Sequence, residues 1–105
     1  MSWLNVTRWL QGESKLRQRA EHIAARCEEA VWRLCREHAL ALNPAQARGY
    51  VRARASLIVN HAVESASGDL RACQRLRELT MDALVRQIGA QLRAVRPALR
   101  TREAA

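Results

Sequence analysis

One short stretch near the middle of the chain, Asn43-Pro44-Ala45-Gln46, constrains the fold more than any other. Asn43 is a favoured N-cap residue, Pro44 suits the first position of a helix, and Gln46 completes a capping box with Asn43. One long helical pattern ends just before this stretch, and a second begins with it. The stretch therefore predicts a hairpin of two long helices.

The rest of the sequence predicts a third helix and a single all-α domain. The chain has 105 residues, of which 49% are hydrophobic, and this is enough for one packed core. Phenylalanine is absent and alanine, leucine and arginine dominate, which favours helix over sheet. Ser67-Gly68-Asp69 predicts the second break, because Gly68 suits a helix end and Asp69 suits a helix start. The predicted fold is an antiparallel three-helix bundle with helices over residues 14–42, 44–66 and 70–96.

The two ends of the chain are predicted to differ from the bundle. The pattern of residues 2–11 predicts a short amphipathic helix that ends at Gly12. A helix of this length is not stable alone and needs a surface on which to dock. Pro97 is expected to end the third helix. The predicted organisation is an accessory Trp-containing helix at 1–12, the bundle at 13–97 and a frayed basic tail at 98–105.

Apolar stripes run along the first two predicted helices. In the first helix they follow alternating steps of four and three, which is typical of a bundle seam. That stripe comprises Leu16, Ala20, Ile23, Cys27, Ala30, Leu34 and His38. The stripe of the second helix comprises Ala47, Tyr50, Val51, Leu57, Ile58 and Ala62.

The third predicted helix carries two apolar stripes, and Trp32 points away from the stripe of the first helix. This is more apolar surface than one three-helix core uses, so we expect burial against a second copy or another protein, with a dimer favoured. The expected interface residues are Trp3, Trp9, Trp32, Leu76, Leu79 and Ala83. The first functional hypothesis is therefore a non-enzymatic interaction module. Docking of residues 2–11 on the bundle is the alternative use of this surface.

The charge of the chain supports a second hypothesis. The net charge is +8, and 17 of the 18 basic residues are Arg, which favours acidic partners or reflects GC-rich coding. No acidic residue lies between His38 and Val63, and positive charge increases towards the C-terminus. A sequence-tolerant nucleic-acid binder is the alternative function, and membrane contact through residues 2–11 is less favoured. The expected anion contacts are Arg75, Arg86, Arg93, Arg96, Arg48 and Arg52.

Several polar residues lie within the apolar stripes. Cys27, His61 and Cys73 are expected at one height in the bundle, and these residue types bind zinc, although their spacing is not diagnostic. Two buried cysteines beside a hydrogen-bonded histidine are the alternative. Arg54 and Arg77 predict either ion pairs with Asp82 or Glu28, or an anion pocket in the core.

The sequence carries no catalytic motif, so no enzyme activity and no cofactor are expected. An odd number of cysteines within helical patterns does not predict a disulfide framework, and this favours a reducing compartment. No signal peptide or membrane-spanning pattern is found. The predicted location is the cytoplasm.

Overall fold

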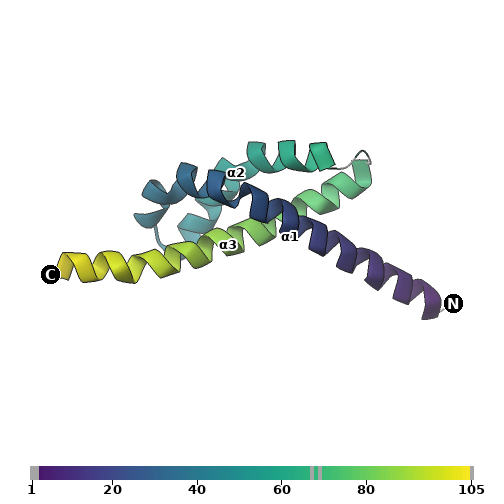
Figure 1. The fold of residues 1–105 in the computed structure, drawn as a ribbon, viewed down its shortest axis with the longest axis horizontal. Coiled ribbons are helices and arrows are strands. Elements are labelled where there is room, and N and C mark those ends of the chain that lie inside the picture. The colour runs from purple at the N-terminus through teal and green to yellow at the C-terminus, as the bar shows by residue number, and fades with distance from the viewer. Residues whose placement is uncertain (1–2, 67, 69, 105) are drawn as a thin grey trace.

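The computed structural model describes residues 3–66, 68 and 70–104, and side chains within 12–66, 68 and 71–96. Three helices make up this part of the chain, with no strand: α1 (Trp3–Leu40), α2 (Pro44–Ala66) and α3 (Leu70–Ala104). In Figure 1, α1 and α3 run in one direction and α2 runs in the opposite direction, and every pair of helices packs together. The predicted antiparallel three-helix bundle is confirmed.

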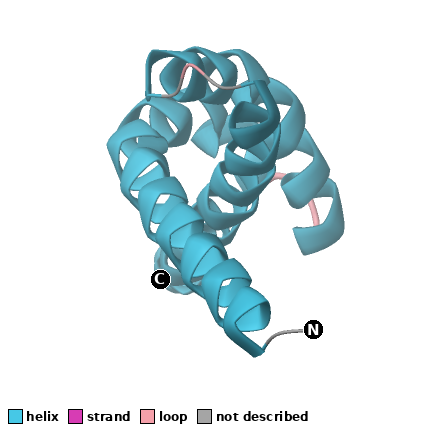
Figure 2. Cartoon of the chain, turned by 90° about the vertical axis from the view of Figure 1, so that its right-hand side faces the viewer, coloured by secondary structure: helices cyan, strands magenta, loops and turns pink. Residues whose placement is uncertain are grey.

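The bundle is elongated because α1 and α3 are much longer than α2. The molecule measures 64 × 28 × 20 Å and its radius of gyration is 16.7 Å, compared with about 13 Å for a compact domain of this length. The N-terminal part of α1 and the C-terminal part of α3 extend past α2 in opposite directions (Figures 1 and 2). Over the described ranges, no helix has a stretch apolar and long enough to cross a bilayer.

The predicted capping box between α1 and α2 is present. The backbone N–H of Gln46 donates to Oδ1 of Asn43 over 2.8 Å, and the N–H of Asn43 donates to Oε1 of Gln46 over 3.2 Å. The N–H of Ala47 also donates to the carbonyl of Asn43 over 2.8 Å. These bonds satisfy donors that a helix start leaves without partners, so α2 begins at Pro44 as the sequence predicts.

The helices continue through two residues that were expected to end them. Gly12 lies within α1, so residues 3–11 are part of this helix and do not form a separate accessory helix; a helical glycine costs only about 1 kcal/mol relative to alanine. Likewise α3 continues past Pro97 to Ala104. Proline removes one hydrogen bond at a cost of about 3 kcal/mol, and the strong helix formers that follow it support the continuation. The predicted frayed tail at 98–105 is therefore helical over 98–104, and the side chains of this segment lie outside the described set.

The core is formed by rows of residues four apart. The fully buried row of α2 is Ala47, Val51, Ala55, Val59 and Val63. The buried residues of α1 are Ala20, Ile23, Ala24, Cys27, Val31, Cys35 and Ala39. Rows of residues four apart are the ridges that pack when helices cross obliquely, as α1 and α3 do in Figure 1.

The residues that are buried differ from the prediction in the second half of both stripes. Val31 and Cys35 are buried where Ala30 and Leu34 were expected, and Leu34 is 43% exposed. Leu57 of α2, also expected inside, is 80% exposed. The predicted alternation of four and three suits nearly parallel helices, whereas steps of four rotate the buried face around each helix.

Candidate functional site

The predicted metal site is wrong for the described part of the chain. No group of three His, Cys, Asp or Glu side chains there is placed to hold a metal ion. Cys27 and Cys73 are buried in the core, while His61 lies exposed on α2. The buried row of residues four apart in α2 turns His61 away from the core.

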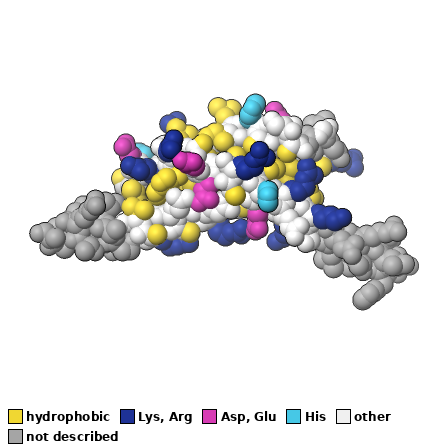
Figure 3. All heavy atoms as spheres, viewed as in Figure 1, with side chains coloured by type: hydrophobic (Ala, Val, Ile, Leu, Met, Phe, Trp, Pro, Cys, Tyr) yellow, Lys and Arg dark blue, Asp and Glu magenta, His cyan; other side chains and the backbone are white. Residues whose placement is uncertain are grey.

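Part of the predicted partner interface is used inside the chain. Leu76 and Ala83 are 0% and 3% exposed and belong to the core, so they are not available to a partner. Trp32 and Leu79 are partly buried and pack against the same core. The side chains of Trp3 and Trp9 lie outside the described set. In Figure 3 the hydrophobic atoms form small areas between charged side chains.

A groove between α2 and α3 gathers four of the six predicted anion contacts. Arg48 lies on the α2 wall, and Arg86, Arg93 and Arg96 lie on the α3 wall. The remaining lining residues are Pro44, Ala47, Val51, Val85, Gly89 and Leu92. We refer to this feature, with a volume of about 240 Å³, as the basic groove. Its lining contains no Asp or Glu among the residues that the structure describes.

Two of these arginines make polar contacts within the chain. Nη2 of Arg86 lies 3.3 Å from Oε1 of Glu21 on α1, and both side chains are more than half exposed. Nη2 of Arg96 donates to the backbone carbonyl of Leu42 over 2.7 Å. The bond to Leu42 positions the Arg96 guanidinium. A surface pair such as Arg86–Glu21 contributes little to stability, so an anion can replace Glu21 at Arg86.

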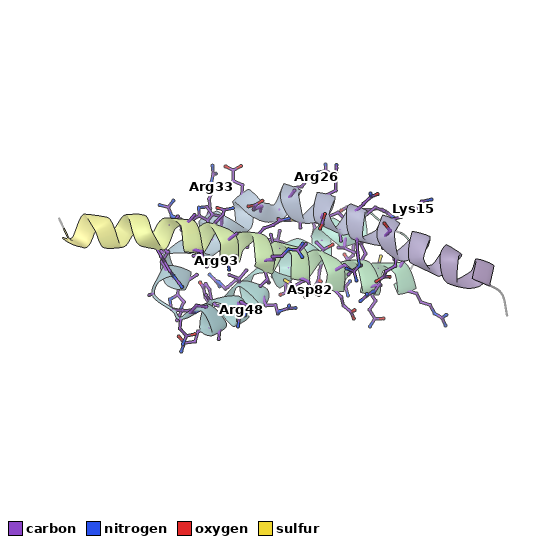
Figure 4. The ribbon with its side chains drawn as sticks, turned by 90° about the horizontal axis from the view of Figure 1, so that it is seen from below. Lys15, Arg26, Arg33, Arg48, Asp82 and Arg93 are labelled. Atoms are coloured by element: carbon purple, nitrogen blue, oxygen red, sulfur yellow. The ribbon has the colours of Figure 1, made fainter. Side chains whose placement is uncertain are left out.

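Arg48 and Arg93 have no hydrogen bond or ion pair with any other described residue. Figure 4 looks at the lower edge of Figure 3, where Lys and Arg atoms gather, and shows the two arginines on neighbouring helices. Pro44 adds the positive end of the α2 dipole to the same region. The basic groove therefore concentrates positive charge, and within the described part of the chain only Arg86 of its four arginines has an acidic partner.

The other two predicted contacts are paired elsewhere. Arg52 binds Asp82, with Nη2 and Oδ1 2.7 Å apart, so Arg52 rather than Arg54 is the partner of this carboxylate. Arg75 binds Glu13 on α1 and Glu78 within α3. The hydrogen bond to Glu13 raises the pKa of the Arg75 guanidinium and lowers the pKa of the Glu13 carboxyl below 4.5. Arg52 and Arg75 thus contribute to helix packing instead of to the groove.

The two arginines expected inside the bundle lie near its surface. Arg54 is exposed, with its guanidinium carbon 6.0 Å from the centre of the Tyr50 ring, and this ring also contacts His38 at a centroid distance of 4.6 Å. Arg77 is half-buried, and its Nε has no hydrogen-bond partner in the described structure. They lie on different helices and do not form the core anion pocket that was one of the alternatives.

The cysteines are placed for packing. Cys35 is fully buried and Cys27 is 6% exposed, and burial raises the pKa of both thiols. A raised pKa keeps a thiol protonated at neutral pH and lowers its reactivity. Cys27 and Cys35 therefore act as small apolar core residues in this structure.

Sequence reasoning missed the apolar floor of the basic groove. Val51 was read only as part of an apolar stripe, and Val85 and Gly89 were not considered. One available signal was the absence of acidic residues over 38–63, which leaves the α2 wall with positive charge alone. Comparison of the chain with protein-family models, curated proteins and solved structures gave no match.

Proposed function

We propose that this protein is a non-enzymatic interaction module whose basic groove binds an acidic segment of a partner protein. The observation that carries the proposal is the combination of four arginines with an apolar floor and, in the described lining, no carboxylate. Apolar surface between charged groups is typical of protein interfaces, where arginine is enriched. The lining also supplies no nucleophile or general base in its described part, which supports a binding role.

A protein partner suits the groove better than nucleic acid. Proteins that bind single strands without sequence preference usually combine basic grooves with aromatic stacking platforms, and the described lining contains no aromatic ring. A duplex binder contacts many phosphates along an extended basic surface. Arg52 and Arg75, which would extend the basic surface, are instead neutralised by carboxylates.

Self-association remains the second candidate. Leu57 is 80% exposed and Leu34 is 43% exposed, and they are the large hydrophobic side chains that the described surface presents most openly. Scattered exposed leucines are ordinary on a monomer, and the burial of Leu76 and Ala83 reduces the surplus that first suggested a dimer. Sedimentation of the wild type and of the Leu57→Asp and Trp32→Asp variants tests this candidate: a monomeric wild type removes it, and an oligomer unchanged in both variants removes these two residues from the interface.

The groove is tested by reversing the charge of its two arginines that lack partners. The probe is a fluorescently labelled peptide of glutamate and leucine, and binding is followed by anisotropy. We expect Arg48→Glu with Arg93→Glu to weaken binding by more than about tenfold, since each reversal replaces attraction by repulsion. Arg26→Glu with Arg36→Glu on α1 is the matched control, because it changes the net charge equally and neither residue lines the groove.

Two outcomes of this experiment would contradict the proposal. Equal weakening by both pairs of substitutions would show that net charge, and not the groove, controls binding. Tighter binding of a labelled DNA duplex than of the peptide, at the same salt concentration, would favour the nucleic-acid hypothesis. A fall in affinity with salt is expected in either case, so salt dependence alone does not discriminate.

A further inference from the structure

We infer, building on the proposed function, that the segment bound in the basic groove is an amphipathic helix with an apolar stripe between carboxylates. Its apolar side chains would enter the groove between Pro44 and Gly89, over a floor of almost fully buried core residues, and its carboxylates would pair with Arg48 and Arg93. The partner is thus identified by chemistry: an acidic helix from another protein, with acid groups on both sides of an apolar face.

The walls of the groove favour a helical ligand over an extended one. Both walls are α-helices, whose backbone groups are already hydrogen-bonded within α2 and α3. An extended peptide gains no main-chain hydrogen bonds here and leaves its own N–H and C=O groups against an apolar floor. A helix satisfies these groups internally and presents only side chains, which is the helix-in-groove mode of recognition.

The dimensions of the groove suit two or three helical turns. Its α3 wall extends from Val85 to Arg96, which is about 16 Å at 1.5 Å per residue. Each wall contributes a small residue to the lining, Ala47 on α2 and Gly89 on α3. A Cβ added at Gly89 would make ordinary van der Waals contact with Nη1 of Arg93, at 3.6 Å, so the Arg93 guanidinium lies beside this glycine. Because the side chains at these two positions are small or absent, the backbone of another helix can approach closely.

The volume of the basic groove favours the insertion of a few side chains from a larger molecule. At about 240 Å³ the groove is smaller than the roughly 300–1,000 Å³ of typical small-molecule sites. It is therefore suited to one or two apolar side chains anchored from a larger molecule. Arg48 on one wall and Arg93 on the other then flank the anchor, and each lacks a carboxylate partner within the described chain.

The test compares three labelled 16-residue peptides of identical net charge. The first places leucines four residues apart with glutamates on both sides of that stripe. The second contains the same residues in an order that disperses the leucines, and the third has proline at its centre. We expect the first to bind at least about tenfold more tightly than the others, because only it presents a continuous apolar face.

Substitutions at two glycines provide a test from the protein side. Gly89→Leu fills the groove and is expected to weaken binding of the first peptide about tenfold, the scale of one lost apolar anchor. Gly49→Leu is the matched control, since Gly49 is exposed on α2 and lies outside the groove. Circular dichroism melting of both variants confirms that they fold.

The outcomes separate this inference from the proposed function. Equal affinity for all three peptides, reduced by charge reversal at Arg48 and Arg93, would overturn the helical ligand and leave acidic-segment binding intact. Binding that is insensitive to that charge reversal, or no binding of any peptide, would overturn both. Unchanged affinity of the first peptide for Gly89→Leu would also overturn the helical ligand.

Discussion

Arg96 on α3 donates a hydrogen bond to the backbone carbonyl of Leu42, just beyond the end of α1, with 2.7 Å between Nη2 and the oxygen. The same guanidinium nitrogen lies 3.5 Å from the carbonyl oxygen of Ala39. Carbonyls at a helix C-terminus have no intrahelical partner, and a cation there also interacts favourably with the helix dipole. Arg96 therefore joins the α1–α2 turn to α3 and, at the same time, lines the basic groove.

Arg96→Ala should destabilise the fold by about 1–2 kcal/mol, because a part-buried hydrogen bond from a charged group is lost. Arg36→Ala, at an exposed position of α1, should change the free energy of unfolding by less than about 0.5 kcal/mol. Urea unfolding of the two variants measures the difference. Equal stability would show that the bond to Leu42 contributes nothing.

Leu84→Ala should cost about 2–5 kcal/mol, because Leu84 is fully buried on α3 and its truncation leaves a cavity. Leu57→Ala should cost less than about 0.5 kcal/mol, because Leu57 is 80% exposed. The comparison tests which face of each helix forms the core. A large loss at Leu57 would mean that a second molecule covers this leucine or that α2 is rotated.

Acidification should remove the contribution of the Glu13–Arg75 pair. The hydrogen bond from Arg75 holds the pKa of the Glu13 carboxyl below 4.5 in the folded state. A lowered folded-state pKa stabilises the protein above the unfolded-state pKa, and this contribution is lost as the pH falls through the folded value. The difference in unfolding free energy between the wild type and Glu13→Gln should therefore shrink below about pH 4.5.

The measurement is thermal unfolding of both proteins across this pH range. Glu29→Gln is the matched control, because Glu29 pairs with Arg33 within α1 and both side chains are about three-quarters exposed. A constant difference between the wild type and Glu13→Gln down to low pH would contradict the assigned pairing.

Cys27 and Cys35 should react slowly with a thiol-specific disulfide reagent in the folded protein at neutral pH. Both are buried, and burial raises the pKa of their thiols. Urea should increase both rates as unfolding exposes the side chains. Leu57→Cys supplies an exposed thiol as a positive control. Rapid labelling of Cys27 and Cys35 in the native state would contradict the packing described for α1.

Local signals predicted the architecture well, and long-range packing decided what they missed. The capping box at Asn43 and the stripe from Leu16 to Cys27 depend on neighbouring residues, so the sequence contains them. The burial of Val31 instead of Ala30 depends on the angle at which α1 crosses α3. That angle arises from side-chain ridges on both helices, which the pattern of one helix does not reveal.

The candidate site was predicted only in part, because it too depends on contacts between helices. Arg48 and Arg93 were expected to contact an anion, but a count of charges does not show which arginines have internal partners. Arg52 and Arg75 were grouped with them, although the fold places Asp82 and Glu13 beside these two. Val51 was read only as part of an apolar stripe, because periodicity does not distinguish a packed residue from the floor of a groove.

The most direct test of the central claim is the amide NMR spectrum of the ¹⁵N-labelled protein during titration with the acidic, leucine-striped helical peptide. We predict that shifted amides concentrate in residues 45–51 and 85–96, on the two walls of the basic groove, and that Arg48→Glu with Arg93→Glu abolishes these shifts. Shifts concentrated on α1, or no shifts at peptide concentrations well above that of the protein, would contradict peptide binding in the basic groove.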